Sequence, residues 1–255
     1  MSDTAVGDAV ERVLKPIQQF TRGWMLSRST AEYGVGLGFA SGEDFWICGR
    51  AGVLGECRAD VAAAGLAFIA PEVVARAWDS LPSGMTHSQV ADEYAGRCTE
   101  WGRTALAGFD RGDMQRLDAL GRRVAAAAPP ALGSLFAGWR AMPVPDDVGS
   151  RVALTTQVLR EMRGAAHIVA IQSCGLTPLD AVLASPAAPP RSGPGWAEHL
   201  GWTAPFRDPE EVRQARLQAE LVTSAILAPY FGILSGAELD EFTELVVTTR
   251  GSLDM

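Results

Sequence analysis

The run from Arg160 to His167 combines the side-chain types that bind anions and transfer protons. Arg160, Arg163 and His167 follow one another at spacings of three and four residues, which places them on one face of a helix. Arginines recognise carboxylate and phosphate groups through forked hydrogen bonds, and histidine changes its protonation near neutral pH. The run therefore predicts an anion-binding pocket in which His167 binds the ligand or moves a proton.

The competing interpretation is that the stripe formed by Arg160, Arg163 and His167 is a helix face exposed to solvent. Helix statistics favour a face in water, where Glu161 offers local ion pairs. Gly164 favours a covered face instead. A glycine inside a helix lowers its stability by about 1 kcal/mol relative to alanine, so its presence suggests that a ligand or a second helix lies close to the backbone. The polar arc comprises Thr156, Arg160, Arg163, Gly164, His167 and Ile171, and the opposite side comprises Val152, Val158, Leu159, Met162, Ala166 and Val169.

Two shorter segments also contain arginines in suggestive surroundings. In Cys48 to Gly55, Arg50 lies among three glycines, which fits a functional arginine on a tight turn or, with more weight, a loop that lets two helices pack closely. The pair Trp139 and Arg140 fits either a cation–π contact or an ordinary helix end.

These residues must be positioned by helices, because hydrophobic periodicity is helical almost everywhere. We expect an almost all-α protein in which the helix opened by Asp146 or Asp147 and closed by Gly175 is the strongest. Pro16 is expected to kink or divide the first helix. The expected helices cover residues 8–25, 29–39, 71–78, 86–105, 114–128, 131–142, 146–173, a short helix from 177, 209–227 and 236–248.

Composition narrows the class of protein. The chain has 255 residues, is 47% hydrophobic and carries a net charge of −8, so it can bury a core and is a poor general binder of nucleic acid. It contains no apolar stretch of membrane-spanning length and no export signal, which predicts a cytoplasmic protein without a membrane partner. The four cysteines form no C-x-x-C pair and are expected to be free thiols.

The sequence lacks the motifs that are typical of several classes of enzyme and binding protein. No Walker A loop, G-x-G-x-x-G fingerprint, nucleophile elbow or H-E-x-x-H zinc motif occurs, so neither a metal site nor a cofactor is expected.

Five segments resemble a known family in their order along the chain. They are Gly49-Arg50-Ala51 with Leu54-Gly55, the run from Ala141 to Asp147, the run from Leu159 to His167, Gly201-Trp202-Thr203, and Ala228-Pro229-Tyr230. The chain resembles a family of actinobacterial helix-turn-helix proteins, similar to MarR-like winged-helix regulators, that carries an R-E-x-R-G-x-x-H motif. The resemblance implies that Arg50, Arg160, Glu161, Arg163 and His167 share one site.

The sequence departs from the family pattern in two places. Ala165 stands where an acidic residue is expected, which removes a partner for His167 or for a ligand. The segment 209–227 has no hairpin signal, so the wing of a winged helix is expected to be missing. Residues 193–255 carry four basic and ten acidic side chains, a net charge of 4 − 10 = −6, which disfavours DNA binding there.

The Pro/Gly-rich run at 186–195 predicts a linker after a helical domain at 5–185. The resemblance implies that the segment at 196–250 is a degenerate winged-helix-like part. The leading functional hypothesis is binding of an anionic or mixed polar and apolar small molecule by Arg50, Arg160, Arg163 and His167. One alternative is an enzyme with His167 and Glu161 as acid and base between arginine clamps. The other is a DNA-binding transcriptional regulator. Nucleic acid is a disfavoured partner, and a homo-oligomer is left open.

Overall fold

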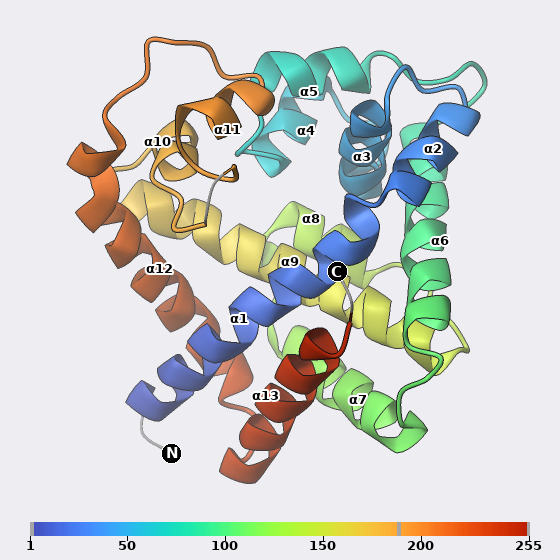
Figure 1. Cartoon of the computed structure of the whole chain (residues 1–255), viewed down its shortest axis with the longest axis vertical. Coiled ribbons are helices and arrows are strands. Elements are labelled where there is room, and N and C mark those ends of the chain that lie inside the picture. The colour runs from blue at the N-terminus through green and yellow to red at the C-terminus, as the bar shows by residue number, and fades with distance from the viewer. Residues whose placement is uncertain (1–2, 188–189, 254–255) are drawn as a thin grey trace.

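The computed structural model describes residues 3–187 and 190–253, and every regular element in them is a helix (Figure 1). The prediction of an all-α fold is confirmed. No helix in the described part of the chain is both long and apolar enough to cross a membrane. The helices are α1 (Asp3–Met25), α2 (Arg28–Gly36), α3 (Gly42–Ala51), α4 (Ala59–Gly65), α5 (Pro71–Trp78), α6 (His87–Ala105), α7 (Arg111–Ala127), α8 (Ser134–Arg140), α9 (Val148–Ser173), α10 (Pro178–Leu183), α11 (Gly193–His199), α12 (Pro209–Phe231) and α13 (Gly236–Gly251), with short 3-10 helices at Gly52–Leu54 and Pro130–Leu132.

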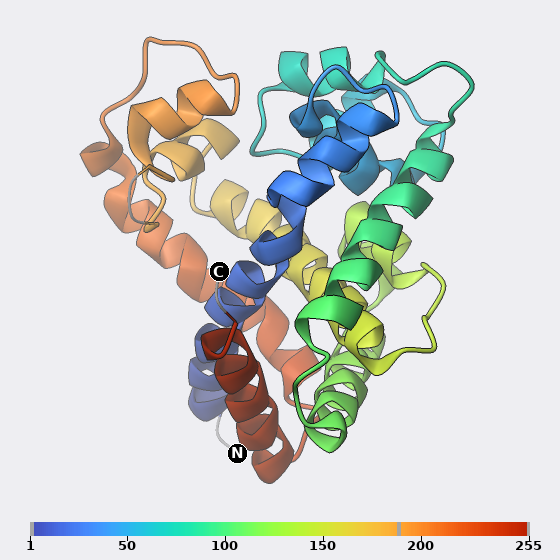
Figure 2. The ribbon, with the colours of Figure 1, turned by 45° about the vertical axis from the view of Figure 1, so that its right-hand side comes forward.

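Helix α9 runs through the middle of the molecule, and α1 crosses over it (Figures 1 and 2). Helices α1, α6, α7, α8 and α12 all pack against it. Sixteen of its 26 residues are buried, and they lie on every side of the helix. The interpretation of the Arg160–His167 stripe as a solvated face is therefore wrong, because α1 and α12 cover that face.

Local signals place the ends of α9 as the sequence predicts. Asp147 is the N-cap, and its carboxylate accepts a hydrogen bond from the Ser150 backbone N–H at 2.8 Å. At the other end Gly175 adopts a φ of 72°, the left-handed conformation that glycine tolerates best. Both ends are thus determined by residues next to them in the sequence.

Close contact between α6 and α9 depends on two glycines at their crossing. A Cβ added at Gly149 would lie 2.6 Å from the Gly102 carbonyl oxygen, and one added at Gly102 would collide with the Gly149 carbonyl oxygen. Only glycine lets the two backbones approach this closely.

Two local predictions are wrong. The segment around Arg50 is not a loop: it forms the end of α3, whose N-cap Ser41 lies farther upstream. Helix α12, expected to end at residue 227, continues through Pro229 to Phe231. Of the two effects expected of Pro16, it does not divide α1, which is one helix on both sides of it. In both cases buried apolar residues on either side of the proline, such as Leu227 and Phe231 in α12, keep the segment helical.

Most buried apolar residues belong to one cluster, and a second, smaller cluster joins the end of α9 to α10 and α12. One buried cluster includes Val13 of α1, Leu183 of α10, Leu227 of α12 and Val246 of α13. The division at 186–195 stays a prediction, and its residues 188–189 lie outside the described part. In 196–253, which the structure describes throughout, there is no strand that could form a wing.

Candidate functional site

Arg50 and Glu161 form a buried, two-pronged ion pair between α3 and α9. Arg50 donates from Nε to Glu161 Oε1 at 2.7 Å and from Nη2 to Oε2 at 2.9 Å. The Glu161 side chain is 1% exposed and also accepts a hydrogen bond from Gln157 Nε2 at 2.8 Å. Trp139 Nε1 donates to the Arg50 backbone carbonyl and so holds the end of α3 in place. The structure thus brings together Arg50 and the Arg160–His167 run, as the resemblance implies.

Arg160 has no carboxylate partner among the described residues. Its Nη1 donates to the Gln18 backbone carbonyl at 3.3 Å and to Thr21 Oγ1 at 3.1 Å, both on α1, and its Nε has no acceptor in the described chain. Burial, together with the neighbouring Arg50 guanidinium, lowers the pKa of Arg160 to about 9. A buried guanidinium whose acceptors are all neutral has no negative charge to offset the cost of its desolvation.

Arg163 shares a single carboxylate with a second arginine. Arg163 Nη2 lies 2.8 Å from Glu220 Oε2, and Arg216 Nη1 lies 2.6 Å from Glu220 Oε1. Burial alone would raise the pKa of Glu220, but the two guanidiniums outweigh it and lower that pKa. Arg163 Nε is buried with no acceptor in the described chain.

His167 is buried against α12 in a defined tautomer. Its Nδ1 lies 2.8 Å from Thr223 Oγ1, and that hydroxyl donates its own hydrogen to the Ala219 carbonyl at 2.6 Å. The Thr223 oxygen must therefore accept from Nδ1–H, so we assign the proton to Nδ1 and a bare lone pair to Nε2. Nε2 is buried without a partner among the described residues. The Phe68 ring lies 5.6 Å away, centroid to centroid.

We expect His167 to make the folded protein lose stability in mild acid. Burial, followed by the charges of Arg163 and Arg216, pushes the pKa of His167 far below its ordinary value near 6.5. Protonation then favours the unfolded chain, so stability falls as the pH falls below about 6.5. By pH 5 the loss reaches about 2 kcal/mol.

Urea unfolding at neutral pH and at about pH 5 measures this loss, and the variant His167→Gln should lack that portion. Equal pH dependence in the two proteins would contradict the assignment of a neutral buried imidazole.

The predicted site is part of a larger arginine cluster, which we define as Arg22, Arg50, Arg160, Arg163 and Arg216. Arg22 of α1 is partly buried and has no hydrogen-bond or ion-pair partner in the described chain; burial, with the charges of Arg191 and Arg163, lowers its pKa. Within the part of the chain that the structure describes, only Glu161 and Glu220 form ion pairs with the cluster, which leaves a net charge of 5 − 2 = +3. The whole chain has a net charge of −8, so the arginine cluster is a positively charged region within an acidic protein.

Further polar atoms without partners lie around the Arg50–Glu161 pair. Trp24 Nε1, Tyr94 OH and Gln157 Oε1 are buried and have no partner among the described residues. The rings of Trp24 and Tyr94 are 4.7 Å apart, and burial raises the pKa of Tyr94 although the charges of Arg50 and Arg160 oppose this. Such atoms are rare in native interiors unless something occupies the space beside them.

Open space lies next to Gly164. A Cβ added there would meet only Glu161 Oε2, at 3.9 Å, so no second helix packs on this glycine. Of the two explanations for Gly164, close packing of another helix is therefore wrong.

Other site residues were not visible in the sequence. Arg22, Tyr94, Arg216, Glu220 and Thr223 belong to α1, α6 and α12, and none stands in a motif that marks it as a neighbour of α9. Only the packing of these helices on α9 brings them to the site.

The geometry disfavours an acid–base pair of Glu161 and His167. Six helical residues separate them, about 600° of rotation, so their side chains leave α9 about 120° apart. Glu161 already accepts three hydrogen bonds, and the lowered pKa makes His167 a weak base.

Of the two interpretations of Trp139 and Arg140, the ordinary helix end is confirmed, because α8 ends at Arg140, and the cation–π contact between them is wrong. The Arg140 guanidinium instead lies 4.9 Å from the Phe136 ring centroid, and Trp139 is directed to Arg50. Neighbours in a helix point in directions about 100° apart, so the two side chains diverge.

Comparison with known proteins identifies a family. Searches of curated proteins and of solved structures found no match. The sequence pattern described as the helix-turn-helix family matches residues 8–253, nearly the entire chain. The match includes every residue of the arginine cluster. This chain therefore belongs to the helix-turn-helix family.

Proposed function

We propose that this helix-turn-helix protein binds a small organic anion in the arginine cluster. The observation that carries the proposal is the uncompensated charge: five guanidiniums gather around two carboxylates, and Arg160 has only neutral acceptors. Buried charges in proteins are normally paired, because an unpaired ion keeps its desolvation cost. A bound anion would supply the missing partner.

The polar atoms without partners indicate what such an anion carries. The Nε atoms of Arg160 and Arg163 are hydrogen-bond donors suited to carboxylate or phosphate oxygens. His167 Nε2 is an acceptor, so it suits a hydroxyl or amide N–H on the same ligand. Phe68, which packs on His167, offers an apolar surface beside it. The ligand class is an organic anion that also bears a hydrogen-bond donor.

Replacement of Arg160 by methionine tests this proposal. Arg160→Met removes a cation that lacks a counter-ion, so the unliganded variant should melt no more than a few degrees below the wild type. Hydroxy acids and sugar phosphates, screened by thermal shift, should raise the melting temperature of the wild type and not that of the variant.

Arg76→Met is the matched control, because Arg76 is exposed and has no hydrogen-bond or ion-pair partner among the described residues. It should respond to the anions like the wild type. The proposal fails if no member of the two classes shifts the wild type, or if Arg160→Met responds equally.

DNA binding is the second candidate function, and membership of the helix-turn-helix family is the observation that favours it. Helices α12 and α13 are joined by a four-residue turn at 232–235, a length typical of helix-turn-helix motifs. The first turns of α13 are acidic, however, and their carboxylates face this chain's own arginines. The ion pairs are Arg123–Glu238, Arg116–Glu241 and Arg12–Asp240.

A mobility-shift assay with random and genomic duplexes at about 150 mM salt separates the two functions. Specific regulators bind their sites at about 10⁻⁸ to 10⁻¹¹ M, whereas ligand binding alone allows only weak association that is lost as salt rises. Tight, sequence-selective binding would establish the regulator.

A further inference from the structure

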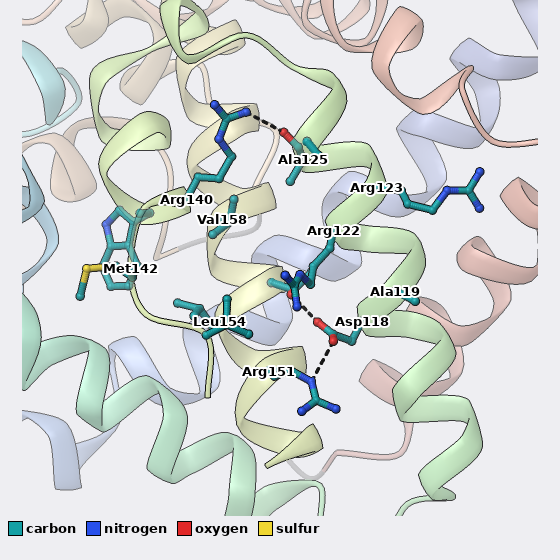
Figure 3. Close-up of a pocket in the computed structure, with 14 residues that line it drawn as sticks. Asp118, Ala119, Arg122, Arg123, Ala125, Arg140, Met142, Arg151, Leu154 and Val158 are labelled. Atoms are coloured by element: carbon teal, nitrogen blue, oxygen red, sulfur yellow. Dashed lines mark hydrogen bonds and ion pairs between the residues drawn. The ribbon is translucent and has the colours of Figure 1, made fainter. Parts of the chain in front are cut away.

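A separate groove lies between α7 and α9, away from the arginine cluster. Its volume is about 460 Å³, within the range of small-molecule sites. Figure 3 shows Leu154 and Val158 of α9 and Met142 of the loop after α8 at this groove. Val144 of the same loop also lines it. No member of the arginine cluster lines it. The residues that line the groove are therefore different from those of the arginine cluster.

Apolar side chains stay open to solvent at this groove. Val144 is 52% exposed, and Met142 is partly exposed. Leu154 and Val158 also line the groove but are buried, each 6% exposed, so Val144 and Met142 offer the more accessible apolar surface for the body of a ligand. Burial of such a surface contributes about 25 cal/mol per Å².

Three of the four arginines at the groove form hydrogen bonds or ion pairs with other residues of this chain. Arg151 donates to Asp118 at 3.0 Å, and Arg123 pairs with Glu238 at 2.5 Å. Arg140 donates to the carbonyls of Ala125 and Ala128 at the end of α7. Figure 3 shows Arg123 directed away from the groove and Arg140 directed toward Ala125.

Arg122 has no hydrogen-bond or ion-pair partner in the part of the chain that the structure describes. The nearest carboxylate one helical turn away, Asp118, is occupied: its Oδ1 accepts from Thr155 at 2.7 Å and its Oδ2 from Arg151. Arg122 extends from α7 toward α9 at the groove that both helices line (Figure 3). A forked donor beside an apolar surface matches a carboxylate with an apolar body.

We propose that the α7–α9 groove binds amphipathic monocarboxylates, with Arg122 receiving the carboxylate and Leu154, Val158, Met142 and Val144 receiving the apolar body. Four arginines and one carboxylate line the groove, and because Arg151 and Arg123 are paired with Asp118 and Glu238, the uncompensated positive charge there belongs to Arg122 and Arg140. The excess of apolar contacts distinguishes this ligand from a simple inorganic anion. This site is independent of the arginine cluster and does not require the proposed function.

Methyl NMR of Met142 tests the site directly. We expect phenylbutyrate and octanoate to shift the Met142 methyl signal in a saturable way, since their apolar bodies would contact it. Phenylbutyramide, which lacks the charge, and inorganic phosphate, which lacks the apolar body, should each bind at least about tenfold more weakly. The variant Met142→Leu assigns the signal.

Arg122→Gln should raise the dissociation constant of both carboxylates about tenfold or more, the effect of losing a charged forked contact. Arg122 is exposed, so the variant keeps its fold. Arg76→Gln serves as the control with unchanged affinity, and Arg160→Met should also bind normally because the arginine cluster is elsewhere.

Absence of a Met142 shift with both carboxylates overturns the proposal. Equal binding of the amide or of phosphate also overturns it, as does wild-type affinity in Arg122→Gln. Loss of binding in Arg160→Met would show that the carboxylates occupy the arginine cluster instead.

Discussion

Glu161→Gln should unfold at a markedly lower temperature than the wild type, with a loss of about 3–5 kcal/mol in the free energy of unfolding. The carboxylate is 1% exposed and, among the described residues, is the only acidic partner of Arg50. Its neutralisation leaves the Arg50 guanidinium without its ion partner in a desolvated place. At about 2–4 °C per kcal/mol for chains of this size, the fall in melting temperature is roughly 6–20 °C, measurable by calorimetry.

Glu11→Gln is the matched control, because Glu11 is exposed on α1 and has no ion-pair partner among the described residues. It should change stability by no more than about 0.5 kcal/mol. The double replacement Arg50→Met with Glu161→Met should recover much of the loss, because it removes both charges together. A loss below about 1 kcal/mol in Glu161→Gln would contradict the buried ion pair.

Gly102→Ala should destabilise the protein by about 2–3 kcal/mol, although alanine favours a helix. The added methyl group would collide with the Gly149 carbonyl and the Ala153 side chain, so α6 would have to move away from α9. The backbone oxygen cannot turn aside as a flexible side chain can. Urea unfolding measures the change.

Gly96→Ala in the same helix should have the opposite sign. Gly96 is exposed, and an added Cβ meets nothing within 4 Å, so the alanine raises stability by about 0.4–1 kcal/mol. If both replacements were stabilising, the close crossing of α6 and α9 would be wrong.

Elements with strong local signals could be predicted from the sequence. Thr86 caps α6 through a capping box with Gln89, and Thr177 does the same for α10 with Asp180. These contacts join residues three positions apart, so they do not depend on the remainder of the fold. Asp147 at the start of α9 belongs to the same class.

Predictions failed where local preference competed with packing. The glycines around Arg50 suggested a loop, yet Phe45, Ile47 and Cys48 are fully or almost fully buried and hold the segment in α3. Pro229 suggested a helix end, yet α12 continues to Phe231. Buried apolar area can outweigh a propensity of about 1–3 kcal/mol, and its extent depends on neighbours distant in the chain.

The sequence by itself determined that Arg160, Arg163 and His167 share one face of a long helix, because helical rotation depends only on spacing. The family resemblance added Arg50 to them. Whether that face met water or other helices was decided by the tertiary structure alone. Periodicity separates polar from apolar faces, and α9 buries both, since α1 and α12 cover its arginines with their own polar groups. Glu220 lies 57 residues from Arg163 in the chain, so only packing brings that carboxylate to the guanidinium.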